Sequence, residues 1–195
     1  NVFMDQVTAS NLVKYDLTGK QAMISQWKAS PAAYNVHASV LAARPEIMAA
    51  VHTHSPANLA VSAQACGLLP LTQQAMRFYQ RIAYYPNEVD DTTRAGTDLM
   101  ARALGEHWVM ILENHGALVC GSTVPEAYIY HHFFELACRA QLGALAGGTK
   151  VKQPSPAVCV ERAKKFGRIG AYDSKSRDWV ASLALLDQRY PDYRI

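Results

Sequence analysis

The feature of this sequence that most limits its possible folds is an apolar run placed between two helical patterns. The run EIMAAVHTH, residues 46–54, has the length of one β-strand and is apolar without strict alternation, so we expect burial on both faces. Before it, PAAYNVHASVLAAR has helical spacing over residues 31–44. After it, Ser55 and Pro56 are typical of a helix start and Gly67 of a helix end. A strand covered by helices before and after it favours an α/β fold.

The second half of the chain predicts further strands and helices. Within residues 108–121, the apolar runs WVMIL and GALVCG flank the polar ENH, most simply as a β-hairpin or a kinked pair of strands. Thr123 and Glu126 then match a capping box that starts a helix ending near residues 147–148. Two more helices are expected in a C-terminal helical tail over residues 150–195. Central strands with helices on both sides predict a three-layer α/β/α sandwich around a mostly antiparallel or mixed sheet.

Length and composition bound the class of protein. With 195 residues, half of them hydrophobic, we expect a single domain over residues 1–195, whose N-terminal part looks truncated. From Lys150 onward there are ten Lys/Arg against five Asp/Glu, a pattern more typical of a solvated face than of a nucleic-acid partner. No apolar window reaches the roughly 20 residues of a membrane helix and no secretory leader opens the chain, so we expect a cytoplasmic protein. The four cysteines lack a CxxC spacing and are expected to be reduced.

A histidine pair ends the strand of residues 46–54. His52 and His54 are two residues apart, which puts them on one face of a strand about 6.5 to 7 Å apart. They lie at the carboxyl end of the strand, where open α/β sheets place ligand crevices. The long helix offers His131 and His132, about 100° apart, and its apolar neighbours favour His132 as a third metal ligand. Three histidines leave a metal ion an open position; the alternative is a set of hydrogen-bonded core histidines.

Three long motifs resemble one known family. HTHSPANLAVSAQACGLLPLTQQA, ILENHGALVCGSTVPEAY and HHFFELACRAQLGALAGG, within roughly residues 30–148, are similar to the class II aldolase/adducin family, and most to its adducin-head-like branch. The resemblance implies a fold like that of fuculose-phosphate aldolase, commonly a tetramer, with a divalent ion at a subunit interface. The implied ligands are His52, His54 and His132, with zinc as the first expectation and manganese or iron as alternatives.

Arg77, Tyr79 and Glu135 are the further candidate site residues. Arg77 follows a segment that faces the active site in the family, and we expect it to anchor an anion; the alternative is an exposed loop arginine. Tyr79 is a candidate proton donor or acceptor, against simple packing beside its neighbours. Glu135, one turn after His132, is expected to orient a ligand imidazole or to act as an acid. The resemblance implies only a supporting role or a structural turn for the segment that contains His115.

The sequence also departs from the family pattern. Ala33 stands where the resemblance implies a catalytic glutamate, and Gln73 or Gln74 stands near the place of a catalytic tyrosine. We therefore expect a metal-dependent lyase that acts on a small hydroxy-carbonyl or carboxylate substrate by aldol cleavage or decarboxylation. The alternative is a non-catalytic adducin-like binding or assembly module with a structural or vacant metal site. A third interpretation is oxygen chemistry at an iron held by three histidines.

Overall fold

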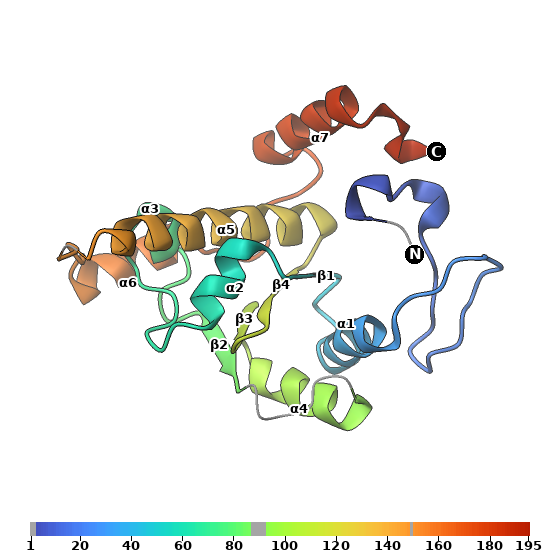
Figure 1. The fold of residues 1–195 in the computed structure, drawn as a ribbon, viewed down its shortest axis with the longest axis horizontal. Coiled ribbons are helices and arrows are strands. Elements are labelled where there is room, and N and C mark those ends of the chain that lie inside the picture. Colours follow the sequence, from blue (N-terminus) through green and yellow to red (C-terminus); the bar gives the residue numbers. More distant parts are fainter. Residues whose placement is uncertain (1–2, 87–92, 149) are drawn as a thin grey trace.

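A four-stranded sheet forms the middle layer of the molecule (Figure 1). The computed structural model describes residues 3–86, 93–148 and 150–195. In these residues the strands are β1 (Ala49–Thr53), β2 (Ile82–Tyr85), β3 (Val109–Leu112) and β4 (Gly116–Gly121), in the order β1-β4-β3-β2. β4 is antiparallel to both of its neighbours, while β2 and β3 are parallel. The prediction of a mixed sheet in an α/β fold is confirmed.

Helices lie before, between and after the strands in the chain, except that β3 and β4 are joined by a turn. The α-helices are α1 (Pro31–Ala43), α2 (Pro56–Ser62), α3 (Gln73–Met76), α4 (Arg94–Leu104), α5 (Val124–Ala146), α6 (Pro156–Phe166) and α7 (Arg177–Arg189), and the 3-10 helices are η1 (Met4–Gln6), η2 (Ala9–Asn11) and η3 (Pro191–Arg194). α5 begins as predicted, because the side chain of Thr123 accepts a hydrogen bond from the backbone N–H of Glu126. None of the helices in the described residues is long and apolar enough to cross a membrane.

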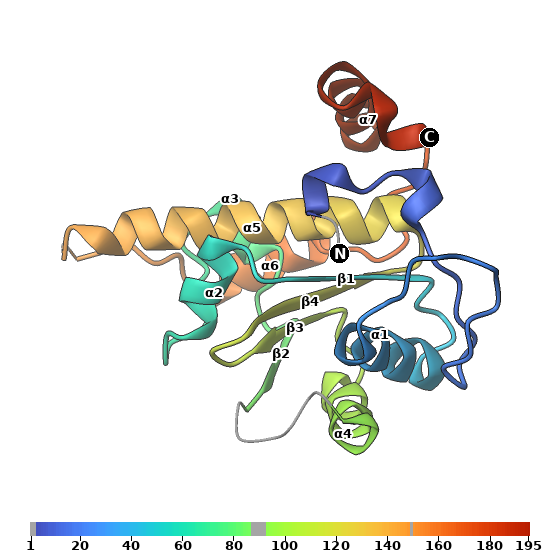
Figure 2. The ribbon, with the colours of Figure 1, turned by 45° about the vertical axis from the view of Figure 1, so that its right-hand side comes forward.

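The two faces of the sheet carry separate cores. Met110 and Leu112 of β3 pack with residues of α1 and α4, whereas Val109 and Ile111 pack with residues of α2 and α5. Successive side chains of a strand point to opposite faces, so one short apolar strand contributes to both cores. Figure 2 shows the result, with α1 and α4 on one side of the strands and α2 and α5 on the other. The predicted α/β/α layering is therefore present.

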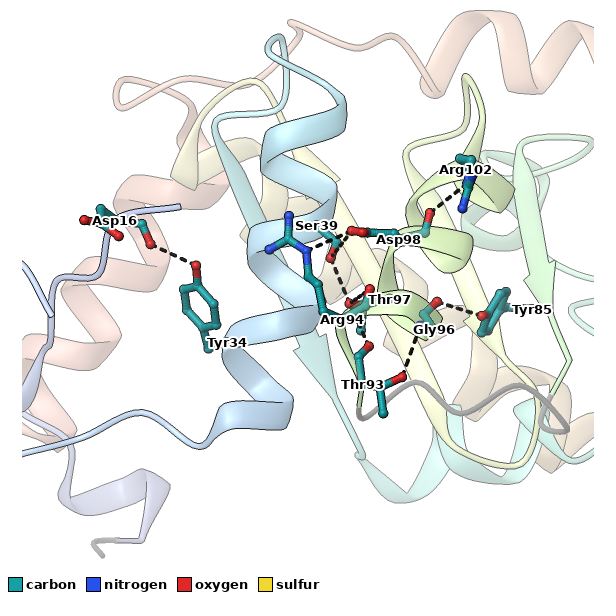
Figure 3. A network of polar contacts seen from close by, with 10 residues as sticks. All are labelled: Asp16, Tyr34, Ser39, Tyr85, Thr93, Arg94, Gly96, Thr97, Asp98 and Arg102. Carbon is teal, nitrogen blue, oxygen red and sulfur yellow. Dashed lines mark hydrogen bonds and ion pairs between the residues drawn. The ribbon is translucent and has the colours of Figure 1, made fainter. Parts of the chain in front are cut away.

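Polar contacts fix α1 against α4 (Figure 3). The Ser39 hydroxyl donates to Thr97 Oγ1 at 2.8 Å, and it lies 3.1 Å from Asp98 Oδ1. Thr97 is fully buried, so this contact replaces hydrogen bonds to water that the hydroxyl groups lose on folding. Tyr34 of the same helix donates to the backbone carbonyl of Asp16 at 2.9 Å and ties the N-terminal segment to α1.

The two helices predicted for the C-terminal tail are α6 and α7. The fully buried carboxylate of Glu126 in α5 accepts hydrogen bonds from the backbone N–H groups of Gly170 and Ala171. These bonds fix the segment between α6 and α7 to α5. α7 lies on the outer side of α5 (Figure 1), and its Trp179 makes an edge contact with Tyr128 at 5.6 Å between ring centroids. The tail is thus anchored through α5, which also covers the sheet.

Candidate metal centre

The end of β1 and the turn between β3 and β4 meet at one edge of the sheet. Thr53 of β1 pairs with Ala117 of β4, and β4 begins directly after His115. The turn is tight because Asn114 has a φ of +56° and Gly116 a φ of +143°. A Cβ atom at Gly116 would lie 2.5 Å from the carbonyl oxygen of Thr53. Only glycine allows the turn to approach β1 this closely.

Three imidazoles converge at this edge. The ligand atoms of His52, His54 and His115 all lie within 4.8 Å of one another. Their ring centroids are 4.7 to 5.0 Å apart, and the Nε2 atoms of His52 and His54 are 3.0 Å apart. His54 is exposed, whereas the other two rings are half-buried. We refer to these three residues as the imidazole cluster.

The cluster suits a divalent metal ion. Nδ1 of His52 lies 3.0 Å from the carbonyl oxygen of Ala117, so Nδ1–H donates there and the lone pair of Nε2 points toward the other rings. Burial lowers the pKa of His52 to about 4, which keeps this ring neutral and able to act as a ligand near neutral pH. Nitrogen ligands of a tetrahedral zinc ion are about 3.3 Å apart, so small side-chain movements would complete the site.

The structure brings together His52 and His54 as predicted but does not bring His132 to them. His132 is exposed on α5, and its ring lies beside Phe133. The neighbouring His131 instead faces β1, where its Nε2 is 2.7 Å from Thr53 Oγ1. Successive helix residues point about 100° apart, so turning His131 toward the sheet turns His132 toward solvent. The helix therefore presents His131, not His132, to the strand that carries the histidine pair.

His115 is the residue that sequence reasoning missed as a direct member of the site. We expected only a supporting role or a structural turn for its segment, yet the His115 ring itself belongs to the cluster. A signal was available, since His115 follows an apolar strand and precedes a glycine. A hairpin between residues 109–121 that also pairs with β1 necessarily returns this turn to the edge where β1 ends.

Glu135 supports the segment that follows the cluster. Its carboxylate accepts a hydrogen bond from Ser55 Oγ at 2.5 Å and pairs with Arg139 at 3.2 Å. Glu135 is only 8% exposed, and Ser55 is the N-cap residue of α2. Asn58 of α2 adds a second tie, because its Nδ2 donates to Thr53 Oγ1 at 2.8 Å. In the described residues, Glu135 thus contacts Ser55 at the start of α2 and Arg139 of its own helix.

Arg77 lies at the other end of the sheet. It lines a cavity together with Val109, the first residue of β3, whereas the imidazole cluster lies beyond the last residue of that strand. It is not an exposed loop residue, because it is only 8% exposed and its Nη1 donates to the Phe166 carbonyl and the Tyr172 hydroxyl. Its guanidinium also lies 4.0 Å from the ring centre of Phe133. The structure therefore does not place Arg77 beside the metal centre.

Tyr79 follows Arg77 in the segment between α3 and β2. It is half-buried, and this segment enters β2 at Ile82, which pairs with Val109 at the start of β3. The predicted proton donor therefore belongs to the same end of the sheet as Arg77. It is not a member of the imidazole cluster.

Comparisons with known proteins agree with this architecture. Residues 1–142 match the family model described as Class II Aldolase and Adducin N-terminal domain. The crystal structure of an aldolase II superfamily protein from Pseudomonas syringae is 33% identical, with a TM-score of 0.90 over all of this chain and 78% of that chain. Alpha-adducin of Rattus norvegicus is 37% identical over 147 residues, which are 72% of this chain but 20% of adducin. L-fuculose 1-phosphate aldolase from Glaciozyma antarctica, at 24% identity, shares the fold with a TM-score of 0.81, over 97% of this chain and 73% of its own.

Proposed function

Because the chain belongs to the class II aldolase and adducin family, we propose that it is a divalent-metal-dependent lyase acting on a small hydroxy-carbonyl or carboxylate compound. The observation that carries this proposal is the convergence of His52, His54 and His115 at one sheet edge. Three imidazoles are a donor set for zinc, with manganese or iron as alternatives. His132, the ligand expected from the sequence, has no part in the proposed site.

The chain's own residues prepare this edge for a ligand. His52 is oriented by its bond to the Ala117 carbonyl, and His115 is carried by a turn that glycine at residue 116 allows. The exposed His54 leaves one side of the cluster open to solvent, from which a small substrate would arrive. A bound divalent ion would supply a Lewis acid that polarises a carbonyl or carboxylate oxygen.

The residues favour decarboxylation over aldol cleavage. Ala33, at the place where the resemblance implies a proton-transferring glutamate, lies exposed on α1 and has no ionisable group. Aldol cleavage needs a base that takes the substrate's hydroxyl proton as the carbon–carbon bond breaks. Loss of carbon dioxide from a carboxylate breaks that bond without this deprotonation, and a proton from water completes the product, so a site without the glutamate suits it better.

We further propose a homo-oligomer, a tetramer by family resemblance, located in the cytoplasm. The exposed side of the imidazole cluster supports the oligomer, since a neighbouring copy would shield the reacting groups from water. All four cysteines are free thiols, in keeping with a reducing compartment.

The second candidate is an adducin-like binding module. Its support is the 37% identity to alpha-adducin together with Ala33 at the implied acid position. In that case the imidazole cluster would hold a structural ion or be vacant, and the chain would turn over no substrate.

Metal analysis combined with a turnover screen tests the proposal. Protein stripped with a chelator and reloaded with zinc or manganese is assayed against hydroxy-carbonyl phosphates and hydroxylated aromatic carboxylates. We expect one ion per chain and metal-dependent turnover, both lost in His54→Ala and both kept in the matched control His132→Ala. Bound metal without turnover of either substrate class would favour the binding module with a structural ion. Failure to bind metal would refute the lyase and leave the binding module with a vacant site.

A further inference from the structure

The cavity that Arg77 lines lies at the end of the sheet opposite the imidazole cluster. It has a volume of about 330 Å³ and is lined by residues from the α3–β2 and α4–β3 segments, β3, α5 and the segment after α6, including Arg77, Arg81, Trp108, Tyr130 and Gly167. Ligand pockets in proteins begin at about this size. We call it the arginine cavity, and the function proposed above does not use it.

Arg77 is a buried cation with incomplete compensation. Its Nη1 makes two hydrogen bonds, but Nε is buried and has no hydrogen-bond partner in the part of the chain that the structure describes. No carboxylate within those residues forms an ion pair with it; its charge faces the rings of Phe133, Tyr130 and Tyr172. Burying a charge without a counter-charge is costly, so an anion at this place would be favoured.

Arg81 brings a second guanidinium to the same wall. Its Nη1 donates to the carbonyl oxygen of Gly167. A Cβ atom at Gly167 would lie 2.6 Å from the Arg77 carbonyl oxygen and 2.9 Å from Arg81 Nη1. A side chain at residue 167 would therefore clash with the Arg77 backbone and the Arg81 guanidinium, so glycine is needed for this close approach. Glu106 also lines the cavity, and two arginines against one glutamate leave a positive balance.

The remaining walls are apolar and aromatic. Phe78, Trp108, Val109, Tyr130 and Ile169 face the same space. Flat apolar groups gain from contact with such rings, while guanidinium groups bind carboxylates through paired hydrogen bonds. We propose that the arginine cavity binds a small carboxylate with a flat apolar body, such as an aromatic acid, independently of the metal centre.

Benzoate is the probe for this site, with benzyl alcohol and inorganic phosphate as comparison ligands. Titration of the whole chain, followed by calorimetry and by the indole N–H resonance of Trp108, should show saturable benzoate binding. We expect benzoate to bind at least about tenfold more tightly than either comparison ligand, since each lacks one of the two recognised groups. Equal binding of benzyl alcohol or phosphate, or no saturation by about 10 mM benzoate, overturns the proposal.

Variants locate the bound probe. Arg81→Met should weaken benzoate binding about tenfold, as should Arg77→Met provided that this variant keeps the native fold by circular dichroism. His54→Ala is the matched control and should bind benzoate as the wild type does, even if it has lost metal. Loss of benzoate binding in His54→Ala, or unchanged binding in a folded Arg81→Met, would place the ligand elsewhere and refute the assignment. These outcomes are independent of whether the chain proves to be a lyase.

Discussion

The two ends of β3 carry opposite chemistry. Beyond its carboxyl end, the imidazole cluster presents nitrogen lone pairs on rings that strand register and one tight turn hold in place. At its amino end, the arginine cavity presents permanent cations among aromatic side chains. Neutral imidazoles accept a cation and guanidinium groups accept an anion, so one four-residue strand separates two sites of opposite preference. Substitutions at one end of β3 should therefore leave ligand binding at the other end intact.

The largest effect is expected from removing His115. His115→Ala takes away one of the three proposed ligands and should weaken zinc binding roughly 1,000-fold. Competition with a chromophoric chelator measures this affinity. His132→Ala, on the exposed side of α5, should leave it within about threefold of the wild type. The opposite ranking of the two variants would restore the ligand set expected from the sequence and reject the geometry described above.

A methyl group at residue 116 should lower stability at the carboxyl end of β3, where the turn approaches the backbone of β1. Gly116→Ala introduces a Cβ atom 2.5 Å from the Thr53 carbonyl oxygen, and we expect a loss of about 3 kcal/mol in the free energy of unfolding. Urea denaturation measures it. Gly143→Ala in α5 is the control, because its added Cβ would lie more than 4 Å from every described atom beyond the neighbouring backbone of its own helix. This helical substitution should add about 0.5 to 1 kcal/mol. Equal stability of both variants would disprove the close approach.

At the arginine end, Glu126 anchors the segment that continues from the cavity wall. Glu126→Gln replaces an acceptor oxygen by an NH₂ group beside backbone donors, and we expect a loss of about 2 kcal/mol in unfolding free energy. Benzoate affinity should fall while zinc affinity stays unchanged. Glu161→Gln, in an exposed ion pair with Lys164, is the control and should change neither. A loss of zinc affinity in Glu126→Gln would show that the two ends are coupled.

The smallest effect is expected at the ion pair between Arg139 and Glu135. Arg139 is 67% exposed, so Arg139→Ala should cost less than about 0.5 kcal/mol of stability. Zinc and benzoate affinities should both remain at the wild-type level, since Glu135 keeps its bond to Ser55. Thermal unfolding with parallel titrations checks both points, and a large change in either affinity would assign Arg139 a role that its exposure does not support.

Local patterns were enough to predict much of this molecule. Each predicted helix start with a capping side chain or proline, as at Thr123 and Pro56, depends on residues within one turn of one another. The pairing of His52 with His54 follows from the two-residue period of a strand. The layered fold follows from the alternation of helical patterns with apolar runs that are too short to be helices.

The remaining features depend on contacts between segments far apart in the chain. The sequence by itself determined that two histidines share a strand face, that a glycine follows His115 and that arginines cluster near residues 77–81. Only the tertiary structure decided that α5 turns His131 rather than His132 toward β1, that the β3–β4 turn carries His115 to the pair, and that the segment after α6 encloses Arg77. Helix rotation and the return of a distant segment are set by packing over the whole core, which no local spacing encodes.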